Sequence, residues 1–164
     1  MRRRREWDGG SRHSPRGGLL QAEDAAWAEF RALTERLNPE QITRLGYQDD
    51  WSVKDLLAHM ACWDAEAAQV LEQLRLGSYL EWDRDVDAFN RECFEACRDL
   101  DLDATWAQLH SSRARMLEEL GCLPDELLER ESTAWEWFED SGITHHDEHL
   151  PRLREWVELL EIHE

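Results

Sequence analysis

Apolar side chains recur every three or four residues along most of this chain, the spacing of one face of an α-helix. The longest such stripe consists of Val53, Leu56, Leu57, Met60, Ala67, Leu71 and Leu74. Ser52 precedes it as a typical N-cap residue, with Asp55 three positions later, and Gly77 follows it as a typical stop. The pattern therefore predicts a helix of about 24 residues, roughly 36 Å long.

Similar stripes predict further helices over residues 19–38, 85–100, 104–120 and 142–162. The first is expected to end at Asn38, because a residue before proline disfavours helical backbone. Residues 85–120 are compatible either with one broken helix or with a short helix followed by a long one.

A first-turn proline is the signal for one more element. Pro124 is followed by Asp125 and Glu126, which predicts a short helix reaching Arg130. No useful stretch alternates apolar and polar residues as a strand does. We therefore predict an all-α fold, a four-helix bundle with an additional short helix.

Charge divides the chain into two parts. The net charge is −18, yet residues 1–18 hold six arginines against two acidic residues, so they carry +4 and residues 19–164 carry −22. We predict a disordered basic leader over residues 1–18 and a single bundle domain over residues 19–164. A body this acidic repels phosphate, so no nucleic acid is expected to bind the folded domain. A weak nucleic-acid or membrane tether is the alternative role for the leader.

The cysteines and the lack of long apolar runs indicate the cellular compartment in which the protein works. The four cysteines form no CxxC pair, no stretch resembles a signal peptide, and no apolar run approaches ~18 residues. We therefore expect a cytoplasmic protein with reduced thiols and no membrane span. Cys93 and Cys97, four apart, are interpreted as buried small apolar residues on one helix face.

Histidines form the pattern that points to chemistry. His145, His146 and His149 fall within five residues, and His59 lies in the predicted helix that follows Ser52. Residues four apart share a helix face, so His145 and His149 can present two imidazoles to one point, to which a packed neighbouring helix can add His59. Three neutral imidazoles with open remaining positions are typical of a catalytic transition-metal site.

A helical projection leaves alternatives open for these residues. The apolar stripe of the last predicted helix centres on His146, with His149 about 40° and His145 about 80° away. His59 lies about 90° from the centre of its own stripe, close to Trp63. Such flank positions suit a site at one end or at the open seam of a bundle. His146 and His149, three apart, are a competing ligand pair, and a solvated histidine pair with a buried His146 is the alternative without a metal.

Three segments resemble signatures of the DinB-like superfamily of four-helix bundles: WSVKDLLAH at residues 51–59 followed by Trp63, DVDAFN at residues 85–90, and HHDEHL at residues 145–150. Together they span roughly residues 20–160. Members typically bind a divalent metal through one histidine of the second helix and an HxxxH pair on the last. The resemblance thus implies His59, His145 and His149 as metal ligands, while His146 fills a position that is usually aromatic or variable.

The superfamily includes S-transferases that use mycothiol or bacillithiol, a mycothiol-dependent maleylpyruvate isomerase and a cyclopropane hydrolase that protects against a genotoxin. The resemblance therefore implies a metal-dependent thiol S-transferase or hydrolase acting on a small-molecule substrate, in stress or detoxification. Its cofactors would be zinc, nickel or iron and a low-molecular-weight thiol, and a homodimer is an open option. Trp63 and Trp135 are expected to wall an apolar pocket, with no catalytic residue assigned.

Two other classes of function remain open. One is a non-catalytic bundle that binds or sequesters a small molecule, with a structural metal or none. The other is an interaction protein whose acidic surface sequesters a basic partner.

Overall fold

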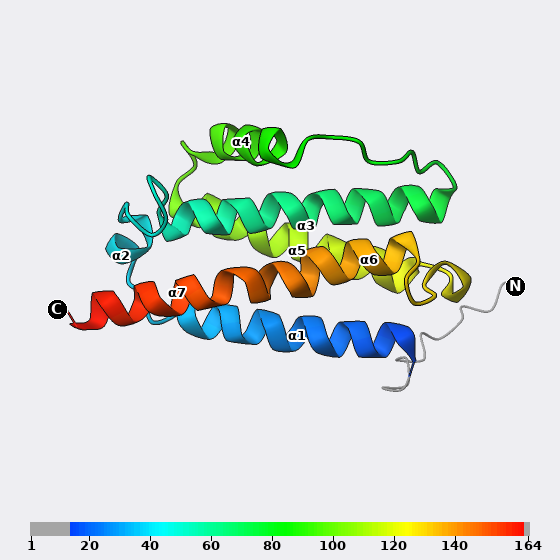
Figure 1. Ribbon diagram of the computed structural model, residues 1–164, viewed down its shortest axis with the longest axis horizontal. Coiled ribbons are helices and arrows are strands. Elements are labelled where there is room, and N and C mark those ends of the chain that lie inside the picture. The colour runs from blue at the N-terminus through cyan, green and yellow to red at the C-terminus, as the bar shows by residue number, and fades with distance from the viewer. Residues whose placement is uncertain (1–13, 163–164) are drawn as a thin grey trace, which may run out of the picture.

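The computed structural model describes residues 14–162, which form an all-helical bundle, as predicted. Its long helices are α1 (Pro15–Thr34), α3 (Val53–Leu76), α5 (Leu102–Cys122) and α7 (His145–Ile162). Figure 1 shows these helices lying side by side, with α4 outside the bundle, above α3. Within residues 14–162, the only bridge between extended residues is an isolated one from Gln48 to Trp51. None of the described helices has the length and apolar character needed to cross a bilayer.

Helix α3 begins and ends where its caps predict. The Ser52 side chain accepts a hydrogen bond from the Asp55 backbone N–H, and the Asp55 carboxylate accepts one from the Ser52 backbone N–H at 2.8 Å. Gly77 ends the helix in the left-handed conformation, with φ of 69°, which costs glycine little because it has no Cβ. α3 packs most extensively against α5.

Helix α1 begins four residues earlier than predicted, so the predicted leader is wrong for residues 15–18. The Ser14 hydroxyl accepts a hydrogen bond from the Gly17 N–H at 3.0 Å, and Pro15 occupies the first turn. Arg16 donates hydrogen bonds to the carbonyls of Leu120 and Leu123 and pairs with Asp125. Residues 1–13 lie outside the described residues, and their part of the leader stays a prediction.

The middle of the chain forms two separate helices, α4 (Val86–Cys97) and α5, which decides between the two options of the sequence. Each begins at an aspartate whose carboxylate accepts a backbone N–H three residues on, Asp85 from Ala88 and Asp101 from Ala104. A short helix α2 (Pro39–Thr43) was not predicted. Cys93 and Cys97 are buried, as expected for their interpretation as small apolar residues.

The helix predicted over residues 124–130 is wrong. Only the 3₁₀ turn η1 (Asp125–Leu127) forms there, without a side-chain cap. The helical structure instead starts at α6 (Thr133–Glu139), where the Ser132 hydroxyl accepts the Trp135 N–H. It continues through the π-helical segment η2 (Asp140–Thr144) into α7, as Figure 1 shows. π-Segments inside helices are frequent at functional sites.

A buried ion pair and an unpaired carboxyl lie in the bundle beside η2. Arg113 of α5 donates hydrogen bonds from Nε and Nη2 to the two oxygens of Glu23 of α1, at 2.6 and 2.8 Å. Gly142 packs so closely here that an added Cβ would lie 3.2 Å from Cγ of Glu23. Asp64 of α3 is 1% exposed, and neither carboxylate oxygen has a hydrogen-bond partner. This group of charged residues joins α1, α3 and α5 at the start of the last helix.

Asp64 should make the protein less stable as pH rises. Burial, followed by the charge of Glu23, raises the pKa of Asp64 well above its ordinary value. The unfolded chain therefore releases this proton at a lower pH than the folded chain, so stability falls as pH rises above about pH 4. We expect Asp64→Asn to raise the melting temperature at neutral pH and to change it little near pH 4. A pH series of thermal melts checks this, with Asp147→Asn as an exposed control; an Asp64→Asn advantage independent of pH would contradict it.

Candidate metal centre

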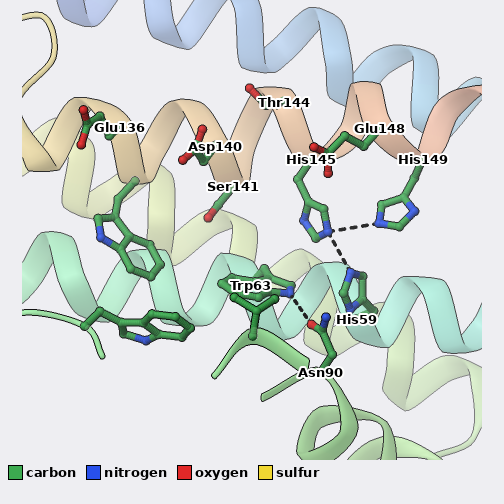
Figure 2. A pocket seen from close by; sticks show the side chains of 13 residues that line it. His59, Trp63, Asn90, Glu136, Asp140, Ser141, Thr144, His145, Glu148 and His149 are labelled. Atoms are coloured by element: carbon green, nitrogen blue, oxygen red, sulfur yellow. Dashed lines mark hydrogen bonds between the residues drawn. The ribbon is translucent and has the colours of Figure 1, made fainter. Parts of the chain in front are cut away.

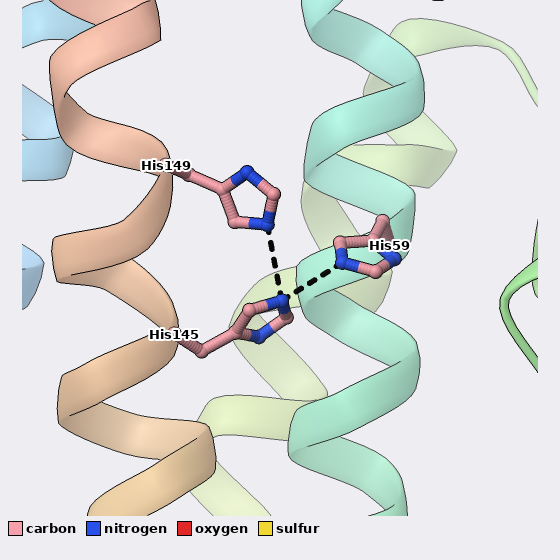
Figure 3. Close-up of side chains that lie close together, drawn as sticks. All are labelled: His59, His145 and His149. Atoms are coloured by element: carbon pink, nitrogen blue, oxygen red, sulfur yellow. Dashed lines mark hydrogen bonds between the residues drawn. The ribbon is translucent and has the colours of Figure 1, made fainter. Parts of the chain in front are cut away.

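Three imidazoles converge between α3 and α7. Nε2 of His145 lies 2.8 Å from Nε2 of His59 and 3.1 Å from Nε2 of His149. One nitrogen from each ring lies within 4.8 Å of the others. Figure 3 shows His145 and His149 reaching from successive turns of α7 toward His59 on α3. The structure thus brings together the three histidines expected from the sequence.

The three rings are neutral at physiological pH. Burial lowers the pKa of His59 to about 4 and that of His145 to about 2, and for His145 the neighbouring His59 and His149 lower it further. Burial also lowers the pKa of His149. Neutral imidazole is the form that binds a metal ion, so protons compete little for these nitrogens at pH 7.

The donor set fits a divalent transition metal. Ligand bonds of 2.0–2.1 Å place the nitrogens of adjacent ligands about 2.9–3.4 Å apart, close to the distances from His145 to its two neighbours. His59 Nδ1 is buried and has no hydrogen-bond partner within residues 14–162. The ring instead packs edge-on against Trp51, with centroids 5.4 Å apart. Packing therefore orients this ring in place of the outer hydrogen bond that metal-binding histidines usually make.

His146 faces away from this cluster. Its ring is 1% exposed and packs edge-on against Trp27 and Phe30 of α1, with centroids 6.2 and 5.3 Å apart. Burial lowers its pKa to about 4. The geometry thus favours the pair four residues apart, His145 and His149, over the pair His146 and His149. The burial of His146 also agrees with the helical projection, which centred the apolar stripe of this helix on His146.

A cavity of about 670 Å³ opens beside the three histidines. Its lining comprises His59, Trp63, Trp82, Val86, Asn90, Glu136, Trp137, Asp140, Ser141, Thr144, His145, Glu148 and His149. Figure 2 shows Glu136 of α6 and Asp140 and Ser141 of η2 along one side, with Trp63 and Asn90 across the cavity. The cavity therefore leaves one side of the histidine cluster accessible to a small molecule.

The tryptophans of this cavity differ in part from those expected. Trp63 lines it and donates its indole N–H to Oδ1 of Asn90 at 2.9 Å. Trp135 does not line it but packs against an apolar cluster and donates to Glu139. Residues two apart on a helix point about 200° from each other, so Trp137 lines the cavity where Trp135 cannot. Trp82, from the loop before α4, was missed because its segment carries no helical pattern.

Comparison with known families identifies the family of this chain. The profile described as the mycothiol maleylpyruvate isomerase N-terminal domain matches residues 24–158. The chain belongs to this family. The family is part of the DinB-like superfamily, so the resemblance seen in the sequence is confirmed. Among curated proteins, none matches the chain.

Two solved structures share the fold. One is an uncharacterised protein from Escherichia coli UTI89, with a TM-score of 0.75, 15% identity, and coverage of 89% of this chain and 94% of that one. The other is the colibactin self-resistance protein ClbS in complex with a double-stranded DNA, with a TM-score of 0.71 and 13% identity. It covers 85% of this chain and 94% of its own. At these identities the likeness shows the fold alone.

Proposed function

We propose that this protein is a metal-dependent enzyme, a thiol S-transferase or a hydrolase that acts on a small molecule. The observation that carries the proposal is the convergence of three neutral imidazoles, one buried and two half-buried, beside a cavity of about 670 Å³. A closed structural site would surround the ion with protein ligands, whereas three histidines beside a cavity leave positions open. Membership of a family named for a mycothiol-dependent reaction agrees with a thiol cofactor.

In this proposal His59, His145 and His149 hold the metal, which is zinc, nickel or iron. A bound divalent ion lowers the pKa of a coordinated thiol or water and so supplies a nucleophile at neutral pH. Trp63, with the Trp137 found in the structure, contacts the apolar part of the substrate. The cavity adjoins the three histidines, so a thiol and an electrophile can meet beside the metal.

The protein's own cysteines do not supply the nucleophile in this proposal. Hydrogen bonding to Cys93, followed by burial, raises the pKa of the Cys62 thiol. A thiol with a raised pKa carries little thiolate at pH 7 and is a poor nucleophile. None of the four cysteines lines the cavity. The attacking thiol or water is therefore expected to come from solution.

Turnover with and without metal tests the proposal. Untagged protein would be stripped with a chelator, reloaded with zinc, nickel or iron, and assayed for consumption of a thiol by electrophiles and for hydrolysis of the same electrophiles. Turnover that depends on metal and is lost in His59→Ala, with the helical circular dichroism retained, would support it. No turnover with any loaded metal would leave the alternative of a sequestration module.

That alternative rests on the aromatic lining of the cavity. Trp63, Trp82 and Trp137 provide a large apolar surface, and no lining residue is placed as a general base. A bundle that only holds a small molecule would gain stability from its ligand, and one with a structural metal would melt at a much lower temperature after chelation. A cytoplasmic location and a homodimer stay predictions in either case.

Binding of double-stranded DNA needs a direct test, because one structural neighbour was crystallised with it. This chain carries −18 overall, and we expect the full chain to bind a labelled duplex no more tightly than ordinary non-specific binding, about 10⁻⁴–10⁻⁶ M. Fluorescence anisotropy at two salt concentrations measures this. Binding well below about 10⁻⁶ M at physiological salt would overturn the expectation.

A further inference from the structure

Three tryptophans from three segments form one wall of the cavity. Trp82 lies 5.8 Å from Trp63 and 5.6 Å from Trp137, and Trp63 lies 6.5 Å from Trp137, measured between ring centroids. Hydrogen bonds hold two of the rings, from the Trp63 indole to Asn90 and from the Trp82 indole to Glu66 at 2.8 Å. The wall is therefore a fixed aromatic surface before any ligand binds.

The charged side chains of the same cavity are all acidic. Glu136, Asp140 and Glu148 line it, and none of them forms an ion pair with another described residue. No arginine or lysine is among the lining residues. Arg84, beside the wall, is placed over the Phe89 ring and is already paired with Glu92. The cavity thus presents three carboxylates without a cation of its own.

A bound metal would not reverse this balance. Imidazole binds a metal ion in its neutral form, so the three histidines add no charge of their own to the loaded cavity. A divalent ion adds two positive charges against the three negative charges of Glu136, Asp140 and Glu148. The loaded cavity therefore still carries one net negative charge, before any coordinated hydroxide or thiolate is counted.

We propose that this cavity selects a substrate with a positively charged organic group, an alkylated ammonium held against Trp63, Trp82 and Trp137. The faces of tryptophan rings attract such cations through their quadrupole, and quaternary ammonium ligands are a common use of this interaction. Glu136 and Asp140, which line the cavity and are exposed, add charge attraction, and both repel carboxylates and phosphates. The reacting part of the substrate then lies toward the histidines. Any reaction of this cationic substrate rests on the proposed function, whereas its binding to the cavity does not.

Charge separates this proposal from simple stacking. A neutral aromatic ligand would use the tryptophans but gain nothing from the carboxylates, and an anionic one would face three like charges. A cation should therefore bind more tightly than a neutral molecule of the same shape, by about tenfold where the ring contact is desolvated.

A matched set of probes tests it by isothermal titration calorimetry. The probes are (3-hydroxyphenyl)trimethylammonium, its neutral isostere 3-tert-butylphenol, and 3-hydroxybenzenesulfonate. We expect the cation to bind about tenfold more tightly than the phenol and the sulfonate to show no saturable binding. Equal affinity for cation and phenol, tighter binding of the sulfonate, or no binding of the cation would overturn the proposal.

Variants assign the effect to this cavity. Asp140→Asn and Glu136→Gln should each weaken cation binding about two- to fivefold, as for exposed ion pairs, and leave the phenol unchanged. Asp147→Asn is the matched control, because Asp147 is exposed near the same cavity but does not line it. Trp137→Leu should weaken the cation and the phenol together. A control variant as damaging as Asp140→Asn would contradict the assignment.

The same titration in His145→Ala separates this inference from the proposed function. Cation selectivity that persists there supports the inference whether or not the wild-type protein turns over any substrate. Metal-dependent turnover by a wild-type protein that does not bind the cation would overturn the inference alone.

Discussion

A His145→Ala protein is expected to lose its metal while keeping its fold. Nε2 of His145 is the central nitrogen of the cluster, 2.8 Å from Nε2 of His59 and 3.1 Å from Nε2 of His149. Its removal leaves only two imidazoles to hold the metal. Loss of an outer-shell partner alone costs about 10–100-fold in metal affinity, and loss of a ligand should cost more. Elemental mass spectrometry of untagged, reconstituted protein should show near-stoichiometric metal in the wild type and almost none in the variant.

His110→Ala is the matched control for this experiment. His110 is an exposed histidine that stacks on Trp106, with ring centroids 5.6 Å apart, and it does not line the cavity. Its replacement should leave metal content unchanged. His146→Phe should also retain the metal, because His146 packs against Trp27 and Phe30 and not against the cluster. Wild-type metal content in His145→Ala, or no metal in the reconstituted wild type, would remove the ligand assignment.

Arg113→Met is expected to destabilise the fold by about 3–5 kcal/mol, the usual cost of removing one partner from a buried ion pair. Glu23 is 1% exposed, and burial already raises its pKa while Arg113 holds it down. Without the guanidinium, Glu23 would have no cation to offset its charge in a region that also buries Asp64. The loss should be smaller in acid, where Glu23 takes up a proton in the folded chain. Chemical denaturation at neutral and acid pH measures it.

Arg115→Met provides the comparison two residues along the same helix. Arg115 pairs with Glu72 at 2.8 Å, but both side chains are partly exposed, at 49% and 36%. Such pairs contribute about 0–1 kcal/mol, so this variant should change stability little. Adding Glu23→Gln to Arg113→Met should recover part of the loss, since no unpaired charge is then left at Glu23. Equal losses of unfolding free energy in Arg113→Met and Arg115→Met would show that burial does not determine how much the Arg113–Glu23 pair stabilises the fold.

Local signals in the sequence were sufficient for much of this fold. The stripe that begins at Val53, with its capping residues and Gly77, predicted α3 as the structure has it. The same kind of pattern placed His146 at the centre of an apolar face, where it is buried. Where local signals conflicted, the prediction failed: Pro124 and its acidic neighbours suggested a helix, but the chain folds into helix only after Ser132, whose hydroxyl caps it.

The sequence by itself determined the helical class and most helix boundaries. Spacing together with the family resemblance also picked out the three histidines that lie together in the structure, His59, His145 and His149. These depend on periodicity and capping, which act over a few residues. Only the tertiary structure decided that Trp82 and Trp137 line the cavity in place of Trp135, and that Glu23 and Arg113 pair inside the bundle. Those contacts join segments up to 90 residues apart. They depend on how whole helices pack, which no local pattern of side chains specifies.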